Sequence, residues 1–97
     1  MTNTPATRPP VLSVRNSGVR DAVDRAADRL DARGVRLDFA AVEYVESREL
    51  GALVVLNRKV TAAGGKLALV NVGPFVAGVF NVTRLDTILD VHRSGGQ

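Results

Sequence analysis

The 97-residue sequence contains no cysteine and a single histidine, His92. The lack of cysteine excludes a disulfide scaffold, a site with thiolate ligands and a cysteine nucleophile. One histidine argues against a histidine-built metal centre and against a Ser-His-Asp triad. The sequence also shows no base–nucleophile pair, no metal-ligand cluster and no Gly-rich cofactor loop, so we expect a protein without catalytic residues, without a metal and without a cofactor.

Long hydrophobic runs are also absent from the sequence. No apolar stretch approaches the roughly 20 residues that a membrane-spanning helix needs. Residues 1–10 are polar and hold three of the four prolines, which is not the pattern of a secretory signal peptide. We therefore expect no membrane span and a cytoplasmic location.

Aromatic residues make up only 4% of the chain, and charges of both signs are interspersed along it to a formal net charge of +3. Nucleic-acid-binding surfaces usually show a concentrated basic patch with stacking aromatics. The composition therefore argues against a nucleic-acid partner. The hydrophobic content of 45% and the chain length fit one small globular domain.

Apolar residues recur along the chain with a strand period and a helix period in turn. Strands are expected over residues 11–14, 35–39 and 66–72. Helices are expected over residues 18–33, from Ser47 or Arg48 to about residue 63, and from Pro74 onward. A last short element contains Leu85, Ile88, Leu89 and Val91. This alternation predicts a sheet with helices packed on it, joined by crossover connections.

Several residues mark where these elements start and stop. Ser17 is expected to cap the first helix, Gly34 to end it, and Gly64-Gly65 to end the second. The buried stripe of the third helix is expected to comprise Phe75, Val76, Val79 and Phe80. We expect a flexible leader over residues 1–10, a domain over 11–92 and a flexible tail over 93–97.

Ser47 stands where a loop enters the second predicted helix. Its hydroxyl can cap that helix by accepting a hydrogen bond from a backbone N–H. The same hydroxyl, exposed at the positive end of the helix dipole, can instead carry a phosphate. The residues alone leave both roles open.

Five segments spread over more than half of the chain form a recognisable series. They are Leu37-Asp38-Phe39, Glu46-Ser47-Arg48-Glu49-Leu50-Gly51, Ala63-Gly64-Gly65-Lys66-Leu67, Leu69-Val70-Asn71-Val72 and Thr83-Arg84-Leu85-Asp86. In register, this series resembles a STAS domain, the fold of bacterial anti-sigma factor antagonists. That family shows an apolar strand ending in Asp, a loop with Asp-Ser-Ser-Gly-Leu-Gly, an amphipathic helix, a Gly-Gly break, an apolar strand and a Leu-Asp turn. The resemblance implies a single α/β STAS-like domain with a mixed sheet of about four strands and helices packed mainly on one face.

The resemblance also implies a partner-switching function. The unmodified protein would bind an anti-sigma factor of the serine-kinase type and free the sigma factor, and phosphorylation of Ser47 would break that complex. The contact surface would comprise Asp38, Glu46, Ser47, Arg48, Glu49 and, on the exposed side of the second helix, Asn57 and Arg58.

The sequence departs from the family pattern around Ser47. Glu46 replaces the family's Asp, Arg48 its second Ser, and Glu49 its Gly. The family also usually has two strands before the first helix, and only residues 11–14 are clear here. A missing edge strand would leave the sheet edge open to a partner or to a homodimer mate. These departures favour an alternative, a STAS-like structural or accessory subunit of a signalling scaffold or membrane transporter that is not phosphorylated.

Overall fold

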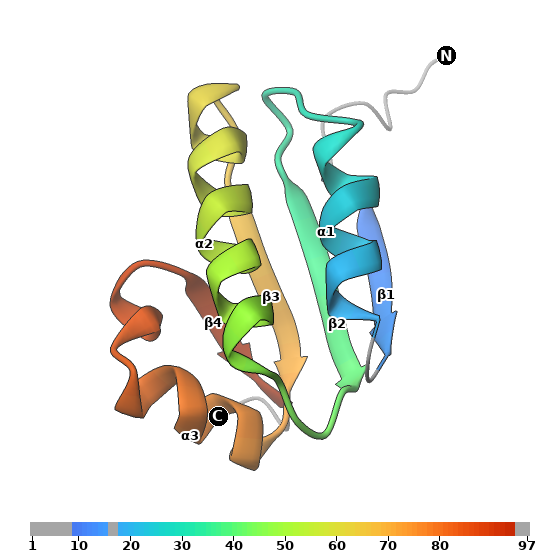
Figure 1. Ribbon diagram of the computed structural model, residues 1–97. Coiled ribbons are helices and arrows are strands. Elements are labelled where there is room, and N and C mark those ends of the chain that lie inside the picture. The colour runs from blue at the N-terminus through green and yellow to red at the C-terminus, as the bar shows by residue number, and fades with distance from the viewer. Residues whose placement is uncertain (1–8, 16–17, 95–97) are drawn as a thin grey trace.

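A computed structural model describes residues 9–15 and 18–94, so most of the expected leader and the last three residues of the expected tail lie outside the described residues. Strands and helices alternate along the chain (Figure 1). The elements are β1 (Val11–Arg15), α1 (Val19–Ala27), β2 (Val35–Ala41), α2 (Ser47–Ala62), β3 (Leu67–Val72), α3 (Pro74–Val82), the 3-10 turn η2 (Leu85–Thr87) and β4 (Asp90–Arg93).

The four strands form one sheet in the order β1-β2-β3-β4, which confirms the α/β class and the expected number of strands. Every neighbouring pair is parallel, so the expected mixed sheet is corrected to a parallel one. The reason is that a helical crossover separates each strand from the next, and such a crossover returns the chain to the end where the previous strand began.

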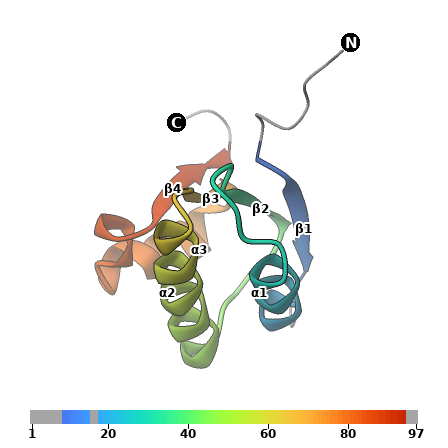
Figure 2. The ribbon, with the colours of Figure 1, turned by 90° about the horizontal axis from the view of Figure 1, so that it is seen from above.

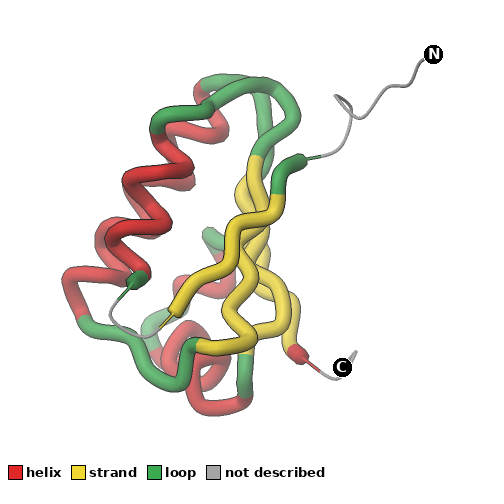
Figure 3. Tube along the Cα trace, turned by 90° about the vertical axis from the view of Figure 1, so that its right-hand side faces the viewer, coloured by secondary structure: helices red, strands yellow, loops and turns green. Residues whose placement is uncertain are grey.

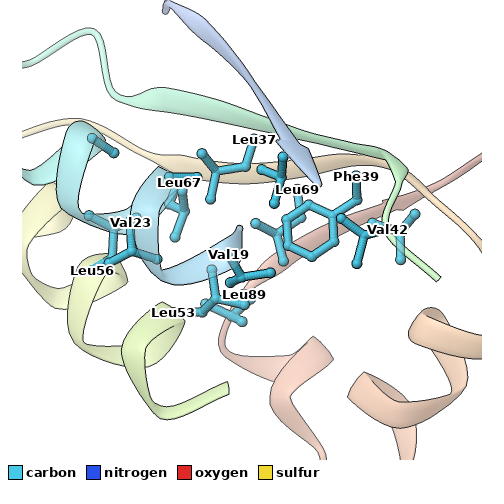
Figure 4. Packing of buried hydrophobic residues seen from close by; sticks show 14 of the residues in the cluster. Val19, Val23, Leu37, Phe39, Val42, Leu53, Leu56, Leu67, Leu69 and Leu89 are labelled. Atoms are coloured by element: carbon cyan, nitrogen blue, oxygen red, sulfur yellow. The ribbon is translucent and has the colours of Figure 1, made fainter. Parts of the chain in front are cut away.

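The helices lie on one face of the sheet, as expected. Figure 2 shows α1 and α2 side by side beneath the strands, and Figure 3 shows the strands and the helices as two layers. Alternation along β2 turns Leu37 and Phe39 toward the helices, where both are fully buried. They pack there with residues of α1 and α2 such as Val23 and Leu53 (Figure 4). Each side chain buried in this way contributes about 1.5–3 kcal/mol.

The first helix is shorter than the sequence indicates. It ends at Ala27, and its N-cap residue is Gly18, while Ser17 lies outside the described residues. Beyond the helix, the Asp31 carboxylate accepts a hydrogen bond from the Arg33 backbone N–H at 2.8 Å. Such a local bond competes with helical hydrogen bonding and turns the chain toward β2. The predicted role of Gly34 as the cap of this helix is therefore wrong.

Gly34 instead carries the turn into β2 at a close approach between chain segments. Its φ is +76°, and a Cβ at this position would lie 2.2 Å from the Lys66 carbonyl oxygen. That same oxygen accepts a hydrogen bond from the Val35 N–H at 3.0 Å, which aligns the starts of β2 and β3. Both the backbone angle and the contact exclude a side chain here.

The buried stripe of α3 also differs from the expected one. Val76, Ala77 and Phe80 are buried, whereas Phe75 is 66% exposed. The side of α3 away from the core therefore presents an apolar surface. This α3 apolar face is lined by Pro74, Phe75, Gly78, Val79, Val82 and Thr83.

A small charge cluster lies at the start of β3 and along β4. Asp90 accepts a hydrogen bond from His92 Nε2 at 3.0 Å and pairs with Lys66 Nζ at 3.5 Å. Burial raises the pKa of Asp90, but hydrogen bonding and electrostatic interaction with His92 and Lys66 outweigh it, so this pKa lies below its ordinary value. The cluster therefore favours the ionised form of Asp90.

We predict that Gly34→Ala lowers the free energy of unfolding by more than about 1 kcal/mol, because Ala is strained at positive φ and clashes with the backbone at Lys66. Gly51→Ala is the matched control, since a Cβ at Gly51 in α2 meets nothing within 4 Å. The free energy of unfolding of that variant should rise by up to about 1 kcal/mol, because Ala has a higher helix propensity than Gly. Urea unfolding measures both, and a Gly34→Ala variant as stable as the parent would contradict the close approach.

A second prediction concerns the pH dependence of stability. Because the folded state lowers the pKa of Asp90, this carboxylate stabilises the fold above the ordinary pKa of Asp, about 4, and loses that contribution as the pH falls through its lower folded value. Asp90→Asn should therefore flatten the acid side of the stability profile. His92→Ala should act in the same direction. Urea unfolding at a series of pH values below about 5 tests this, and an unchanged acid slope in Asp90→Asn would refute it.

Candidate functional site

The candidate site lies at the end of the sheet where the strands terminate. Figure 1 shows the loop after β2 entering the lower end of α2, next to the start of α1. Ser47 is the first residue of α2, and Glu46 is its N-cap residue. In open parallel sheets, binding sites form at this carboxyl edge of the strands.

The start of α2 is capped by the two glutamates that flank Ser47 and Arg48. Glu49 Oε1 accepts a hydrogen bond from the Glu46 backbone N–H at 2.7 Å. The Glu46 carbonyl oxygen in turn accepts from the Glu49 N–H at 2.9 Å. A carboxylate at the third helical position can reach back to the N-cap in this way. The capping role that the sequence allowed for Ser47 is therefore filled by Glu49 and Glu46.

Glu49 is turned inward and is only 6% exposed, the one charged residue that is buried among those the structure describes. Its carboxylate accepts the hydrogen bond from the Glu46 N–H and lies at the positive end of the helix dipole. Ser47, by contrast, is exposed. Its hydroxyl forms no hydrogen bond within residues 9–15 and 18–94, so it is accessible from solvent.

Arg48 of α2 and Arg20 of α1 lie together at the start of α2, where both line one pocket. Arg48 Nε pairs with Glu46 Oε1 at 3.0 Å, and Arg20 Nε of α1 pairs with Asp24 Oδ1 at 3.4 Å. Both arginine side chains are largely exposed, so each pair contributes little to stability. Together with the two glutamates, the arginines line a pocket of about 240 Å³. We call Arg20, Glu46, Ser47, Arg48 and Glu49 the α2 corner.

A groove continues from the α2 corner between the two helices, with a volume of about 290 Å³. Arg20 and Arg48 line both the corner pocket and this groove. Its apolar lining includes Val55, which is 50% exposed. The full lining of this α1–α2 groove is Arg20, Val23, Asp24, Ala27, Arg48, Gly51, Ala52, Val55, Leu56 and Lys59.

Arg20 is a site residue that the sequence reasoning missed. It is the second residue of α1, as Arg48 is the second residue of α2. In a parallel sheet with right-handed crossovers on one face, the amino ends of consecutive helices meet at the same edge. With the strand order known, the equivalent positions of Arg20 and Arg48 in their helices would have predicted that the two arginines lie at the same edge of the sheet.

The other predicted contact residues lie at varying distances from the α2 corner. Arg58 is exposed and follows Ser47 by about three helical turns, so it shares the outer face of α2. Asn57 is half-buried on the flank of that helix. Asp38 lies on the opposite face of the sheet, because its neighbours Leu37 and Phe39 point toward the helices.

Asp38 has its own partners on that opposite face. Its carboxylate accepts hydrogen bonds from the Ala40 N–H at 2.9 Å and from Asn71 Nδ2 at 3.1 Å. The structure therefore brings Glu46, Ser47, Arg48 and Glu49 together and separates Asp38 from them. The physical reason is the two-residue period of β2, which places Asp38 away from α2.

Neither a metal-binding cluster nor a membrane-spanning helix is present in the part of the chain that the structure describes. No group of three or more His, Cys, Asp or Glu side chains there could hold a metal ion. No helix there is long and apolar enough to cross a membrane.

The fold and the site together define a class of protein, a small α/β domain with an exposed serine at the start of the helix that follows its second strand. The chain belongs to the STAS domain family, which its sequence matches over residues 7–96. A search of curated proteins finds no match to this sequence.

Solved structures share the fold. An anti-sigma-factor antagonist (STAS) domain protein from Planctomyces limnophilus superimposes with a TM-score of 0.71 at 23% identity, covering 86% of this chain and 80% of that one. A candidate anti-sigma factor antagonist from Thermotoga maritima gives a TM-score of 0.66 at 24% identity, covering 89% of this chain and 74% of that one. These likenesses confirm the predicted STAS fold.

We predict that the two polar residues at the start of α2 differ in their effect on stability. Glu49→Ala should lower the free energy of unfolding by about 1 kcal/mol or more, because the Glu46 N–H loses its acceptor. Ser47→Ala should change it by less than about 0.5 kcal/mol, because Ser47 is exposed and does not cap the helix. Urea unfolding of both variants is the measurement, and the reverse order of effects would return the capping role to Ser47.

Proposed function

We propose that this protein is an anti-sigma factor antagonist, a cytoplasmic binding protein without catalytic activity of its own. Its partner would be an anti-sigma factor of the serine-kinase type. The observation that carries the proposal is the exposure of Ser47 at the start of α2, where Glu49 and not Ser47 caps the helix. A kinase can therefore modify this hydroxyl without breaking a bond on which the helix depends.

Membership of the STAS domain family and the shared fold with an anti-sigma-factor antagonist domain protein support this proposal. The outer face of α2 offers a contact surface, because Ser47, Gly51, Val55 and Arg58 are exposed along it. With Glu46 and Arg48 at its end, this surface suits a partner that covers Ser47.

The charge that phosphorylation adds to Ser47 would switch partner binding off. The kinase would transfer the γ-phosphoryl group of ATP to Ser47 Oγ, releasing ADP and the hydroxyl proton. A phosphoserine carries about −1.5 to −2 charges at neutral pH. Burying that charge in an interface formed for a neutral hydroxyl would weaken the complex through desolvation and repulsion.

We predict that the unmodified protein binds a serine-kinase anti-sigma factor and becomes about 80 Da heavier on incubation with it and ATP, by one phosphoryl group on Ser47. Ser47→Ala should keep binding and gain no mass, and Ser47→Asp should bind at least about tenfold more weakly while remaining folded. Isothermal titration calorimetry and intact mass spectrometry measure these changes.

Thr61→Ala is the matched control for that experiment, since Thr61 is an exposed hydroxyl near the other end of the same helix. This variant should bind and gain mass like the parent. Equal binding by Ser47→Ala, Ser47→Asp and the parent would show that Ser47 is not the switch.

A second function is favoured by the α3 apolar face. Phe75 is 66% exposed and Val82 is 82% exposed on it, and exposed apolar patches of this kind mark protein interfaces. The protein could accordingly serve as a structural or accessory subunit of a signalling scaffold or membrane transporter. Stable assembly with such a partner through α3, without any mass gain on Ser47, would favour this function over the switch.

Association of two copies through a sheet edge stays a prediction. β1 pairs with β2 on one side only, and β4 pairs with β3 on one side only, so the described sheet has two edges. Val11 on β1 is 55% exposed. An unpaired strand edge of this kind is a template for adding a strand from a second chain.

A further inference from the structure

Two arginines from different helices line one pocket with Glu46 and Glu49, and Ser47 stands in the sequence between Glu46 and Arg48 of that lining. Arg20 and Arg48 are each the second residue of their helix, and both line the pocket at the α2 corner. Their side chains are 70% and 83% exposed, so each can change rotamer without disturbing the core. Both also line the mouth of the α1–α2 groove. A change at the corner that moves these side chains therefore also changes the groove.

The present partners of the two arginines are easily exchanged. Arg48 Nε bonds Glu46 Oε1 at 3.0 Å, and Arg20 Nε bonds Asp24 Oδ1 at 3.4 Å, both in solvent. Exposed single pairs of this kind are weak. Because Arg48 bonds a residue two positions earlier, its guanidinium lies over the amino end of α2, where Ser47 is the first helical residue.

A phosphoryl group on Ser47 would need compensating charge at this corner. Glu46 and Glu49 flank Ser47, and the Glu49 carboxylate is buried and bound to the Glu46 N–H, so it is held near the new charge. Like charges in such proximity are unfavourable. A guanidinium binds phosphate oxygens in a two-pronged manner and more strongly than it binds a single carboxylate in solvent.

We infer that Arg20 and Arg48 form a clamp for a phosphoryl group on Ser47, and that closing the clamp moves both side chains at the mouth of the α1–α2 groove. This inference rests on the proposed phosphorylation of Ser47 and adds its structural consequence. Phosphorylation then does more than repel a partner from Ser47. It exchanges Arg48–Glu46 and Arg20–Asp24 for contacts to phosphate and so reshapes a surface that extends along both helices.

The clamp can be tested on protein in which phosphoserine is incorporated at position 47 during translation. This preparation needs no kinase. Phosphorus NMR follows the second ionisation of the phosphate, whose ordinary pKa is about 6. The clamp should lower this pKa by about half a unit or more, since nearby cations favour the dianion. Arg20→Gln and Arg48→Gln should each raise it back toward the ordinary value.

Arg25→Gln is the matched control for these variants. Arg25 lies on the same helix as Arg20 and forms an exposed pair of the same i,i+4 spacing, with Asp21 at 3.1 Å. It does not line the corner pocket, so its loss should leave the phosphate pKa unchanged. A second measurement compares arginine Nε–Hε NMR signals with and without the phosphate, and those of Arg20 and Arg48 should shift while that of Arg25 stays in place.

Each outcome separates the clamp from the proposed switch. A phosphate pKa at or above about 6 that is the same in all variants would overturn the clamp, even if the kinase phosphorylates Ser47 and partner binding is lost. A lowered pKa that Arg20→Gln and Arg48→Gln restore would establish the clamp. If an anti-sigma kinase then left Ser47 unmodified, the partner-switching function alone would fail.

Discussion

The direction of the strands is the constraint on which the rest of the structure depends. Because all four strands run parallel, each is joined to the next by a crossover, and the helices of the first two crossovers begin at the same edge of the sheet. Burial of β2 residues such as Leu37 and Phe39 against those helices fixes their positions. As a direct consequence, Arg20 lies at the start of α2, although it precedes Ser47 by 27 positions in the sequence.

At the start of α2 the decisive interaction is the one between Glu49 and the Glu46 N–H. A buried carboxylate is costly unless its charge is hydrogen-bonded, and here it accepts that N–H at the positive end of the helix dipole. The bond turns Glu49 inward, so of the residues that replace the family's small ones only Arg48 projects into solvent next to Ser47. Fewer charged side chains therefore surround the Ser47 hydroxyl than the sequence Glu46-Ser47-Arg48-Glu49 suggests.

Local sequence patterns predicted most of the helices and strands. The alternation at residues 35–39 predicted β2, and Ser47 and Gly64-Gly65 marked both ends of α2 within a residue or two. These features depend on nearest neighbours along the chain. The direction of the strands could not be predicted in this way, since alternation is the same in parallel and antiparallel sheets. The exposure of Phe75 depends on which side of α3 meets the core, which apolar periodicity within one helix does not encode when most of its residues are apolar.

The residues of the candidate site likewise fall into those that the local sequence predicts and those that only the three-dimensional fold brings together or separates. Ser47 and its neighbours are contiguous, so a motif located them, whereas Arg20 comes from another helix and Asp38 turns to the other face of the sheet. In the unmodified protein the two arginines are already matched by Glu46 and Asp24. A doubly charged group on Ser47 therefore meets no unpaired cation among the residues of the corner, and it can be neutralised there only by an exchange of partners. At this corner the chain has a set of charges, so the proposed phosphate would act on ion pairs more than on shape.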